Sequence, residues 1–230
     1  GLGGAGLREF LRGYYASVKM IDDQVGRILA ALEETGGLDR TMIVFTADHG
    51  DMAGGHGMVW KSNGSFCDEI VRVPLLMRYP PLFDPQVSHL DVGLVDLMPT
   101  LLAVAGQSCP PSAQGQNLLP FLSGQRSTTE ARRFSFCERV PANAANTRQR
   151  GARRGASFMV RGGGWKYIRY ADGDEVLYHL DADPGETLDR VADPACVETI
   201  RTMRAALAEW QSGTGWSEHT DNGPKAADVK

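Results

Sequence analysis

The residues best suited to chemistry are Asp48-His49-Gly50, which follow an apolar run, Met42-Ile43-Val44-Phe45, after Thr46 and Ala47. A carboxylate and an imidazole in adjacent positions can both face one divalent cation where a strand gives way to a turn, and Gly50 permits such a turn. The aspartate supplies a hard oxygen, and the histidine extends the choice of ion to manganese or zinc-like metals. The pair therefore predicts two metal ligands, Asp48 and His49. The alternative is a capping aspartate beside a buried, hydrogen-bonded histidine.

A second group of polar residues follows in a glycine-rich segment that contains His56 and ends at Lys61. Such a segment can fold back, so that a side chain far along the chain reaches the end of the strand. An ammonium group there would neutralise charge that develops on a transferred anion. We therefore predict that Lys61 binds substrate and is catalytic, and that His56 is catalytic as well. The alternatives are a solvent-exposed lysine and a loop histidine bonded to the backbone.

The elements that must position these side chains are a strand and a helix. Residues 41–46 are apolar without polar alternation, which predicts a strand buried on both faces. Ligands of open α/β sheets lie beyond the carboxyl ends of such strands, where Asp48 and His49 stand. Apolar residues at steps of three and four from Leu7 to Leu32 predict an amphipathic helix over residues 8–34 that packs on a sheet.

In the remainder of the chain the sequence pattern changes from alternating helices and strands to short strands. We predict a strand at residues 71–79 that starts or forms an edge at Pro74, and a helix at residues 92–105 with Pro99 in it. Glycine-separated runs predict antiparallel strands, and one more helix follows. The predicted domains are an α/β part at 1–140, a loop at 141–156, a small antiparallel sheet plus helix at 157–213, and a disordered tail at 214–230.

Composition excludes several classes of protein. The chain has 230 residues, 42% of them hydrophobic, and a net charge of −4, which fits a globular protein and gives no reason to expect nucleic-acid binding. Its four cysteines show no C-x-x-C spacing, so they indicate neither a zinc site nor a disulfide framework. No apolar run is long enough for a transmembrane helix, and the first residues do not resemble a signal peptide. The compartment stays open, with a slight lean to the cytoplasm.

Several of these motifs together resemble the sulfatase family of the alkaline-phosphatase-like superfamily, to which the phosphonate monoester hydrolases are close. They are D-H-G at 48–50, G-x-H-G at 54–57, W-K at 60–61, C-D-E-I-V-R-V-P-L-L at 67–76 and L-Y-H-L-D-A-D-P-G-E at 177–186. The resemblance implies part of a mixed sheet flanked by helices, followed by a small antiparallel sheet with a helix. It also implies calcium, or else magnesium or manganese, at Asp48 and His49, and a small anionic sulfate ester as the substrate.

The nucleophile of that family is a cysteine or serine followed by x-P-x-R, and this sequence does not contain such a segment. Cys109-Pro110-Pro111-Ser112-Ala113 is similar, but an alanine replaces the arginine. We therefore expect the C-terminal portion of a sulfatase-like hydrolase that is inactive alone, and that self-associates or depends on a missing N-terminal half. The alternatives are a phosphonate or phosphate ester hydrolase of the same superfamily, or a non-catalytic remnant or half of a split assembly.

Overall fold

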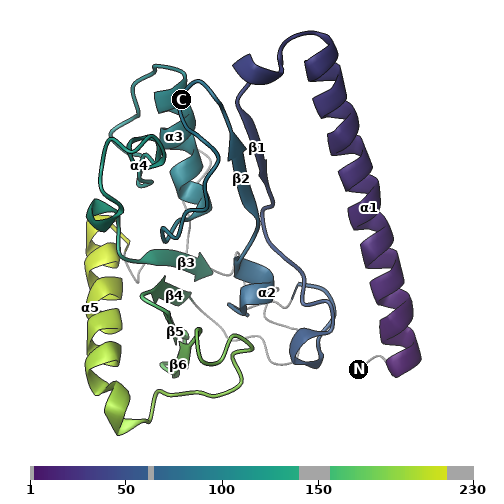
Figure 1. Ribbon diagram of the computed structural model, residues 1–230. Helices are drawn as coiled ribbons and strands as arrows, with labels where there is room; N and C mark the ends of the chain where they lie inside the picture. Colours follow the sequence, from purple (N-terminus) through teal and green to yellow (C-terminus); the bar gives the residue numbers. More distant parts are fainter. Residues whose placement is uncertain (1–2, 62–64, 140–155, 217–230) are drawn as a thin grey trace, which may run out of the picture. The chain divides into compact units, whose positions relative to one another are not determined.

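The computed structural model describes residues 3–61, 65–139 and 156–216 (Figure 1). The chain forms two compact units, Gly1–Ser88 and His89–Lys230. Both combine helices with antiparallel strands, in agreement with the α/β class that the sequence predicts. No helix in the described part of the chain has the length and apolar character needed to cross a membrane.

The first unit is built on one long helix and a two-stranded sheet. Its elements in order are α1 (Gly4–Glu34), η1 (Leu38–Arg40), β1 (Ile43–Thr46), η2 (Gly55–Gly57), α2 (Asp68–Val71) and β2 (Leu75–Arg78). Strands β1 and β2 pair antiparallel, with Ile43 opposite Arg78 and Thr46 opposite Leu75. Strand β2 begins directly after Pro74, as predicted, because proline has no N–H to donate to the ladder.

Two predictions about packing in this unit are wrong. Strand β1 is not buried on both faces: none of its residues is fully buried, and Phe45 is 40% exposed. Helix α1 spans the predicted residues but buries none of them, although its apolar face is present in the sequence. In the described part of this unit β1 pairs with β2 alone, and a sheet of two strands gives β1 and α1 little surface to pack against.

The first half of the second unit is a set of short helices around a buried carboxylate. The elements are η3 (Leu94–Asp96), α3 (Leu97–Val104), α4 (Leu119–Leu122) and η4 (Thr128–Glu130). Asp96 is fully buried and accepts hydrogen bonds from both terminal nitrogens of Arg132 and from the backbone N–H groups of Gly93 and Gln116. Pro99 is buried in the first turn of α3, where a helix has no need of its N–H.

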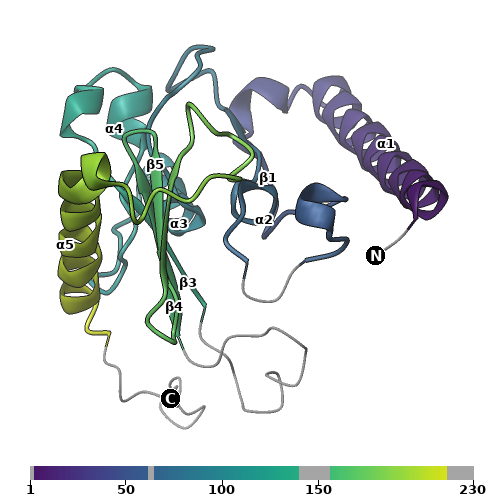
Figure 2. The ribbon, with the colours of Figure 1, turned by 90° about the horizontal axis from the view of Figure 1, so that it is seen from below.

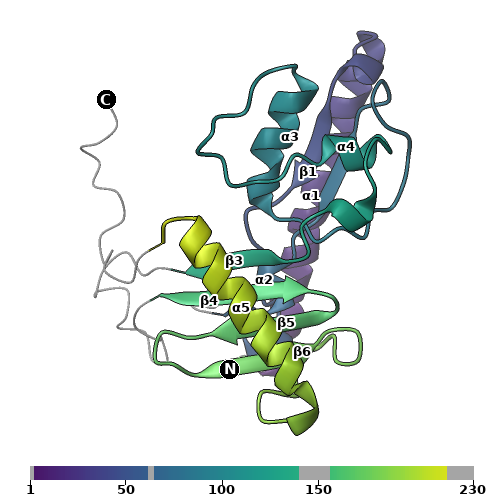
Figure 3. The ribbon, with the colours of Figure 1, turned by 90° about the vertical axis from the view of Figure 1, so that its left-hand side faces the viewer.

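The second half of this unit is the predicted antiparallel sheet with its helix. The strands are β3 (Ser135–Arg139), β4 (Ser157–Gly162), β5 (Trp165–Arg169) and β6 (Glu175–His179), in that spatial order. Helix α5 (Val197–Gly213), preceded by η6 (Pro194–Cys196), runs across one face of the sheet (Figure 3). Strand β3 belongs to this sheet although it precedes the predicted loop at 141–156, which lies outside the described residues except for Ala156. Of the predicted tail, only residues 214–216 are described.

The core of this unit lies between the sheet and α5 (Figure 2). Its fully buried members come from β4, β5, β6, η6 and α5, and they are Phe158, Val160, Tyr167, Leu177, Cys196, Ile200, Met203 and Leu207. Burial of one such large apolar side chain contributes about 1.5–3 kcal/mol. Side chains alternate between the two faces of a strand, so Lys166 lies on the face opposite to Tyr167. Lys166 is also fully buried and forms an ion pair with Glu186 at 2.6 Å.

Candidate functional site

The end of β1 presents a carboxylate and an imidazole next to each other. The Oδ1 atom of Asp48 accepts a hydrogen bond from the backbone N–H of His49 at 2.9 Å, and Oδ2 lies 3.7 Å from Nε2 of His49. Nδ1 of His49 lies 2.8 Å from the carbonyl oxygen of Gly50. A carbonyl only accepts, so Nδ1 must carry the proton and the lone pair of a neutral ring is on Nε2. That lone pair and the Asp48 carboxylate therefore lie side by side.

The segment after this pair folds back on itself. Gly54 donates to the carbonyl of Met58 at 2.8 Å, and the N–H of Met52 bonds the carbonyl of Trp60 at 3.4 Å. The side chain of Met52 is 1% exposed and anchors the segment. Ala53, His56 and Trp60 have positive φ angles of 46°, 51° and 70°, which residues other than glycine rarely adopt. Residues held in such strained conformations cluster at functional sites.

The folded loop brings Lys61 to the strand end. Its Nζ lies 3.5 Å from Nε2 of His49. The structure thus places three of the four predicted site residues together, namely Asp48, His49 and Lys61. It places His56 in a different contact, with Nε2 at 4.0 Å from Oε1 of Glu69.

The pair at the strand end fits a divalent cation. Two ligands at right angles around calcium, with bonds of about 2.4 Å, lie about 3.4 Å apart. The 3.7 Å between Asp48 Oδ2 and His49 Nε2 is close to that value. Calcium takes 6–8 ligands and prefers oxygens, so one carboxylate and one imidazole would supply only a part of its coordination sphere.

A short helix that the sequence did not predict packs against the strand end. Helix α2 (Asp68–Val71) packs against the strand end through Gly50, which donates to the carbonyl of Ile70 at 2.8 Å. A Cβ atom at Gly50 would lie 1.9 Å from the carbonyl oxygen of Glu69, so only glycine fits there. A Cβ at Gly55 would lie 2.6 Å from Oε1 of Glu69. The glycines of the D-H-G and G-x-H-G motifs thus allow α2 and its carboxylate to come close.

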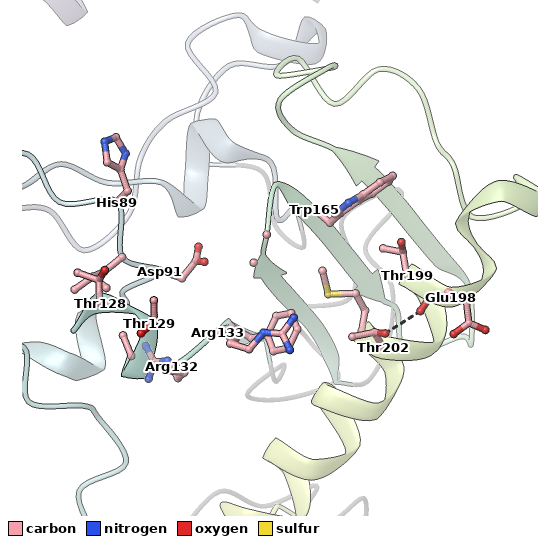
Figure 4. Close-up of a pocket in the computed structure, with 16 residues that line it drawn as sticks. His89, Asp91, Thr128, Thr129, Arg132, Arg133, Trp165, Glu198, Thr199 and Thr202 are labelled. Atoms are coloured by element: carbon pink, nitrogen blue, oxygen red, sulfur yellow. Dashed lines mark hydrogen bonds between the residues drawn. The ribbon is translucent and has the colours of Figure 1, made fainter. Parts of the chain in front are cut away.

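The second unit contains a cavity of about 500 Å³ between η4, the β4–β5 turn and the start of α5 (Figure 4). None of the predicted site residues lines it. Asp91 does, and burial raises the pKa of its carboxyl group, an effect that Arg161, the N–H of Gly163 and Arg132 oppose. Two other charged groups of the cavity are engaged, because Arg132 bonds Asp96 and Glu198 pairs with Arg201.

Comparison with known proteins defines the class of this chain. Residues 4–107 match the family model described as Sulfatase. Arylsulfatase K of Xenopus laevis is 36% identical over 184 residues, which cover 78% of this chain and 33% of that protein. The crystal structure of the phosphonate monoester hydrolase of Agrobacterium radiobacter superposes with a TM-score of 0.75 at 29% identity, covering 87% of this chain and 41% of that one. The fold and the motifs are thus those of the alkaline-phosphatase-like superfamily.

Within that superfamily, the chain belongs to the sulfatase family. The structure of a 2-O GAG sulfatase superposes with a TM-score of 0.80 at 28% identity, covering 93% of this chain and 45% of that protein. The chain spans about a third of the length of the first curated relatives that it matches. The motifs in the sequence had indicated both the family and its phosphonate-cleaving relatives.

Proposed function

We propose that the chain carries the metal-binding and anion-binding part of a hydrolase that cleaves sulfate esters. The observation that carries the proposal is the convergence of Asp48, His49 and Lys61 at the end of β1, with 3.7 Å and 3.5 Å between their reacting atoms. A site of this composition can hold a cation and a tetrahedral anion side by side.

Asp48 and His49 would hold the divalent metal, with calcium as the first choice and magnesium or manganese as the alternatives. The donor set supports a divalent metal at this place, because the proton on Nδ1 leaves Nε2 of His49 free to coordinate next to the Asp48 carboxylate. The bound metal would polarise the oxygen of the anion that approaches it. The hydrogen bond from Nδ1 to the Gly50 carbonyl fixes the orientation of the imidazole ring.

Lys61 would bind and steady the transferred anionic group. Its ammonium lies beside Asp48 and His49, the proposed metal ligands. A bound cation would repel the positively charged ammonium, which would then contact the negatively charged oxygens of the substrate. His56 would assist at the leaving group, and the carboxylate of Glu69 lies 4.0 Å from its ring.

The substrate class rests on the relatives. Proteins described as arylsulfatase K and as choline-sulfatase match most of this chain, and both names denote sulfate ester cleavage. The alternative is a phosphonate or phosphate ester, since a phosphonate monoester hydrolase has the same fold. Nothing in the geometry of Asp48, His49 and Lys61 distinguishes sulfur from phosphorus, because both anions are tetrahedral.

The nucleophile and the remaining metal ligands would come from outside these 230 residues. The sequence contains no cysteine or serine followed by x-P-x-R, and Cys109 lies in an exposed loop. We therefore propose negligible turnover by this chain alone and dependence on a partner segment or on self-association. The exposed apolar residues of α1, such as Tyr15, Met20 and Ile28, support dependence on a partner segment or on self-association. A monodisperse monomer in light scattering would contradict self-association.

The proposal is tested by kinetics on the natural full-length protein that carries these residues. We expect calcium-dependent hydrolysis of an aryl sulfate with a higher kcat/KM than that of a phosphonate monoester. Lys61→Ala and Asp48→Asn should each lower kcat/KM by at least about a hundredfold. Lys19→Ala, which removes an exposed lysine of α1, is the control and should leave the kinetics unchanged. A folded protein that cleaves neither ester, or a Lys61→Ala variant of full activity, would refute the proposal.

A further inference from the structure

A second cluster of metal-ligating side chains lies in the first unit, apart from Asp48 and His49. The ligand atoms of His56, Cys67 and Glu69 all lie within 4.8 Å of one another. They come from two places in the chain, since His56 lies in the glycine-rich loop whereas Cys67 and Glu69 lie at the start of α2. From this arrangement we propose that His56, Cys67 and Glu69 form a binding site for a transition metal ion, with zinc as its best match.

The distances allow coordination after a small adjustment. Two ligands of a tetrahedral zinc ion, with bonds of 2.0–2.2 Å, lie about 3.4 Å apart. Nε2 of His56 and Oε1 of Glu69 are 4.0 Å apart, so about half an ångström of movement closes the pair. Both side chains are about a third exposed, at 27% and 35%, and have room to rotate.

The backbone is shaped for this approach. His56 has a φ of 51°, between two glycines of the G-x-H-G motif, and this left-handed conformation is costly for a histidine. Gly55 lacks the Cβ atom that would otherwise stand 2.6 Å from the Glu69 carboxylate. The sulfur has a supporting contact too, because the hydroxyl of Ser65 lies 2.8 Å from Sγ of Cys67 and donates to it. A donor to sulfur favours the thiolate, which is the form that binds metal.

The ligand chemistry selects the ion. Thiolate, imidazole and carboxylate together suit zinc and its neighbours in the first transition row, whereas calcium and magnesium prefer oxygen ligands and do not favour a thiolate. The cluster is therefore chemically separate from the calcium site proposed at Asp48 and His49. A metal bound here would hold the imidazole of His56, so the metal-bound form could not use His56 at the leaving group.

The test is a titration of the purified 230-residue chain, kept reduced, with Co²⁺ followed by absorbance and with Zn²⁺ followed by calorimetry. A cobalt–thiolate bond produces a charge-transfer band in the near ultraviolet that cobalt bound to oxygen and nitrogen lacks. We expect the band in the wild type and its loss in Cys67→Ser. Cys67→Ser and His56→Ala should each weaken zinc binding at least tenfold.

Two variants serve as matched controls. Cys109→Ser removes an exposed thiol elsewhere in the chain and should keep both the band and the zinc affinity. Asp48→Asn removes a calcium ligand and should also keep them. Should Cys67→Ser fail to fold by circular dichroism, His56→Ala and Glu69→Gln decide the question by zinc affinity alone. Absence of the band in the wild type, or its persistence in Cys67→Ser, would overturn the proposal. The test does not depend on the proposed hydrolase activity.

Discussion

The buried ion pair between Lys166 and Glu186 gives the most quantitative prediction about stability. The two groups are 2.6 Å apart, and their side chains are 0% and 2% exposed. Replacement of Lys166 by methionine keeps an unbranched apolar side chain of nearly the same length but leaves the Glu186 carboxylate buried without this ammonium. Removal of one partner of a buried pair costs about 3–5 kcal/mol. At about 2–4 °C per kcal/mol for a chain of this size, Lys166→Met should lower the Tm by roughly 6–20 °C.

The surface provides an exposed ion pair as a control. Arg201 and Glu198 are also 2.6 Å apart, but both side chains are 75% exposed. Arg201→Met should therefore leave the free energy of unfolding nearly unchanged. The assay is thermal and urea unfolding at pH 7, followed by circular dichroism. The double variant Lys166→Met/Glu186→Gln removes both charges and should be more stable than Lys166→Met. A loss below about 1 kcal/mol in Lys166→Met, or a double variant as unstable as the sum of the two singles, would refute the reasoning.

Two further predictions concern pH and close packing. A hydrogen bond from Arg204 lowers the pKa of Glu175 below its ordinary value of 4.5, so this pair stabilises the fold above that pH and ceases to do so as pH falls through the lowered pKa. Arg204→Met should cost up to about 1 kcal/mol at pH 7, because Arg204 is more than half exposed, and the difference from wild type should shrink as the pH falls through the lowered pKa of Glu175 in acid titrations. A difference that does not shrink on acidification would contradict the assignment. Gly50→Ala should destabilise the chain by about 1–3 kcal/mol in urea unfolding, because its Cβ would meet the Glu69 carbonyl at 1.9 Å. Gly26→Ala in the open middle of α1 is its control and should stabilise by about 0.5–1 kcal/mol. Equal effects of the two substitutions would show that the contact at Gly50 is not tight.

The sequence was sufficient for elements that local signals define. The three- and four-residue spacing of apolar side chains predicted α1, and Pro74 marked the start of β2. Gly163 and Gly164 have φ angles of 59° and 78° and indicated the β4–β5 hairpin, because residues other than glycine rarely adopt such angles. Motif spacing also indicated that Lys61 would return to the strand end, and the structure has it 3.5 Å from His49.

Other features depend on contacts that spacing does not encode. Burial of β1 was predicted from its apolar residues, but burial depends on the layers that cover a strand, and in the described part of this unit β1 pairs with β2 alone. Helix α2 has four residues, too few for a periodic signal. The approach of Glu69 to His56 depends on left-handed residues such as Gly57 and Trp60, and the cysteine spacing lacks a C-x-x-C motif that would have drawn attention to Cys67. A ligand set assembled from two segments leaves no such spacing in the sequence.

The central claim is that Asp48 and His49 hold a divalent cation beside Lys61. The most direct test is the selective broadening of histidine ring signals by Mn²⁺ in NMR spectra of the 230-residue chain. We predict that the His49 ring signals broaden first, that excess Ca²⁺ restores them, and that Asp48→Asn removes the effect. Broadening of all five histidines alike, or no change in Asp48→Asn, would contradict the claim.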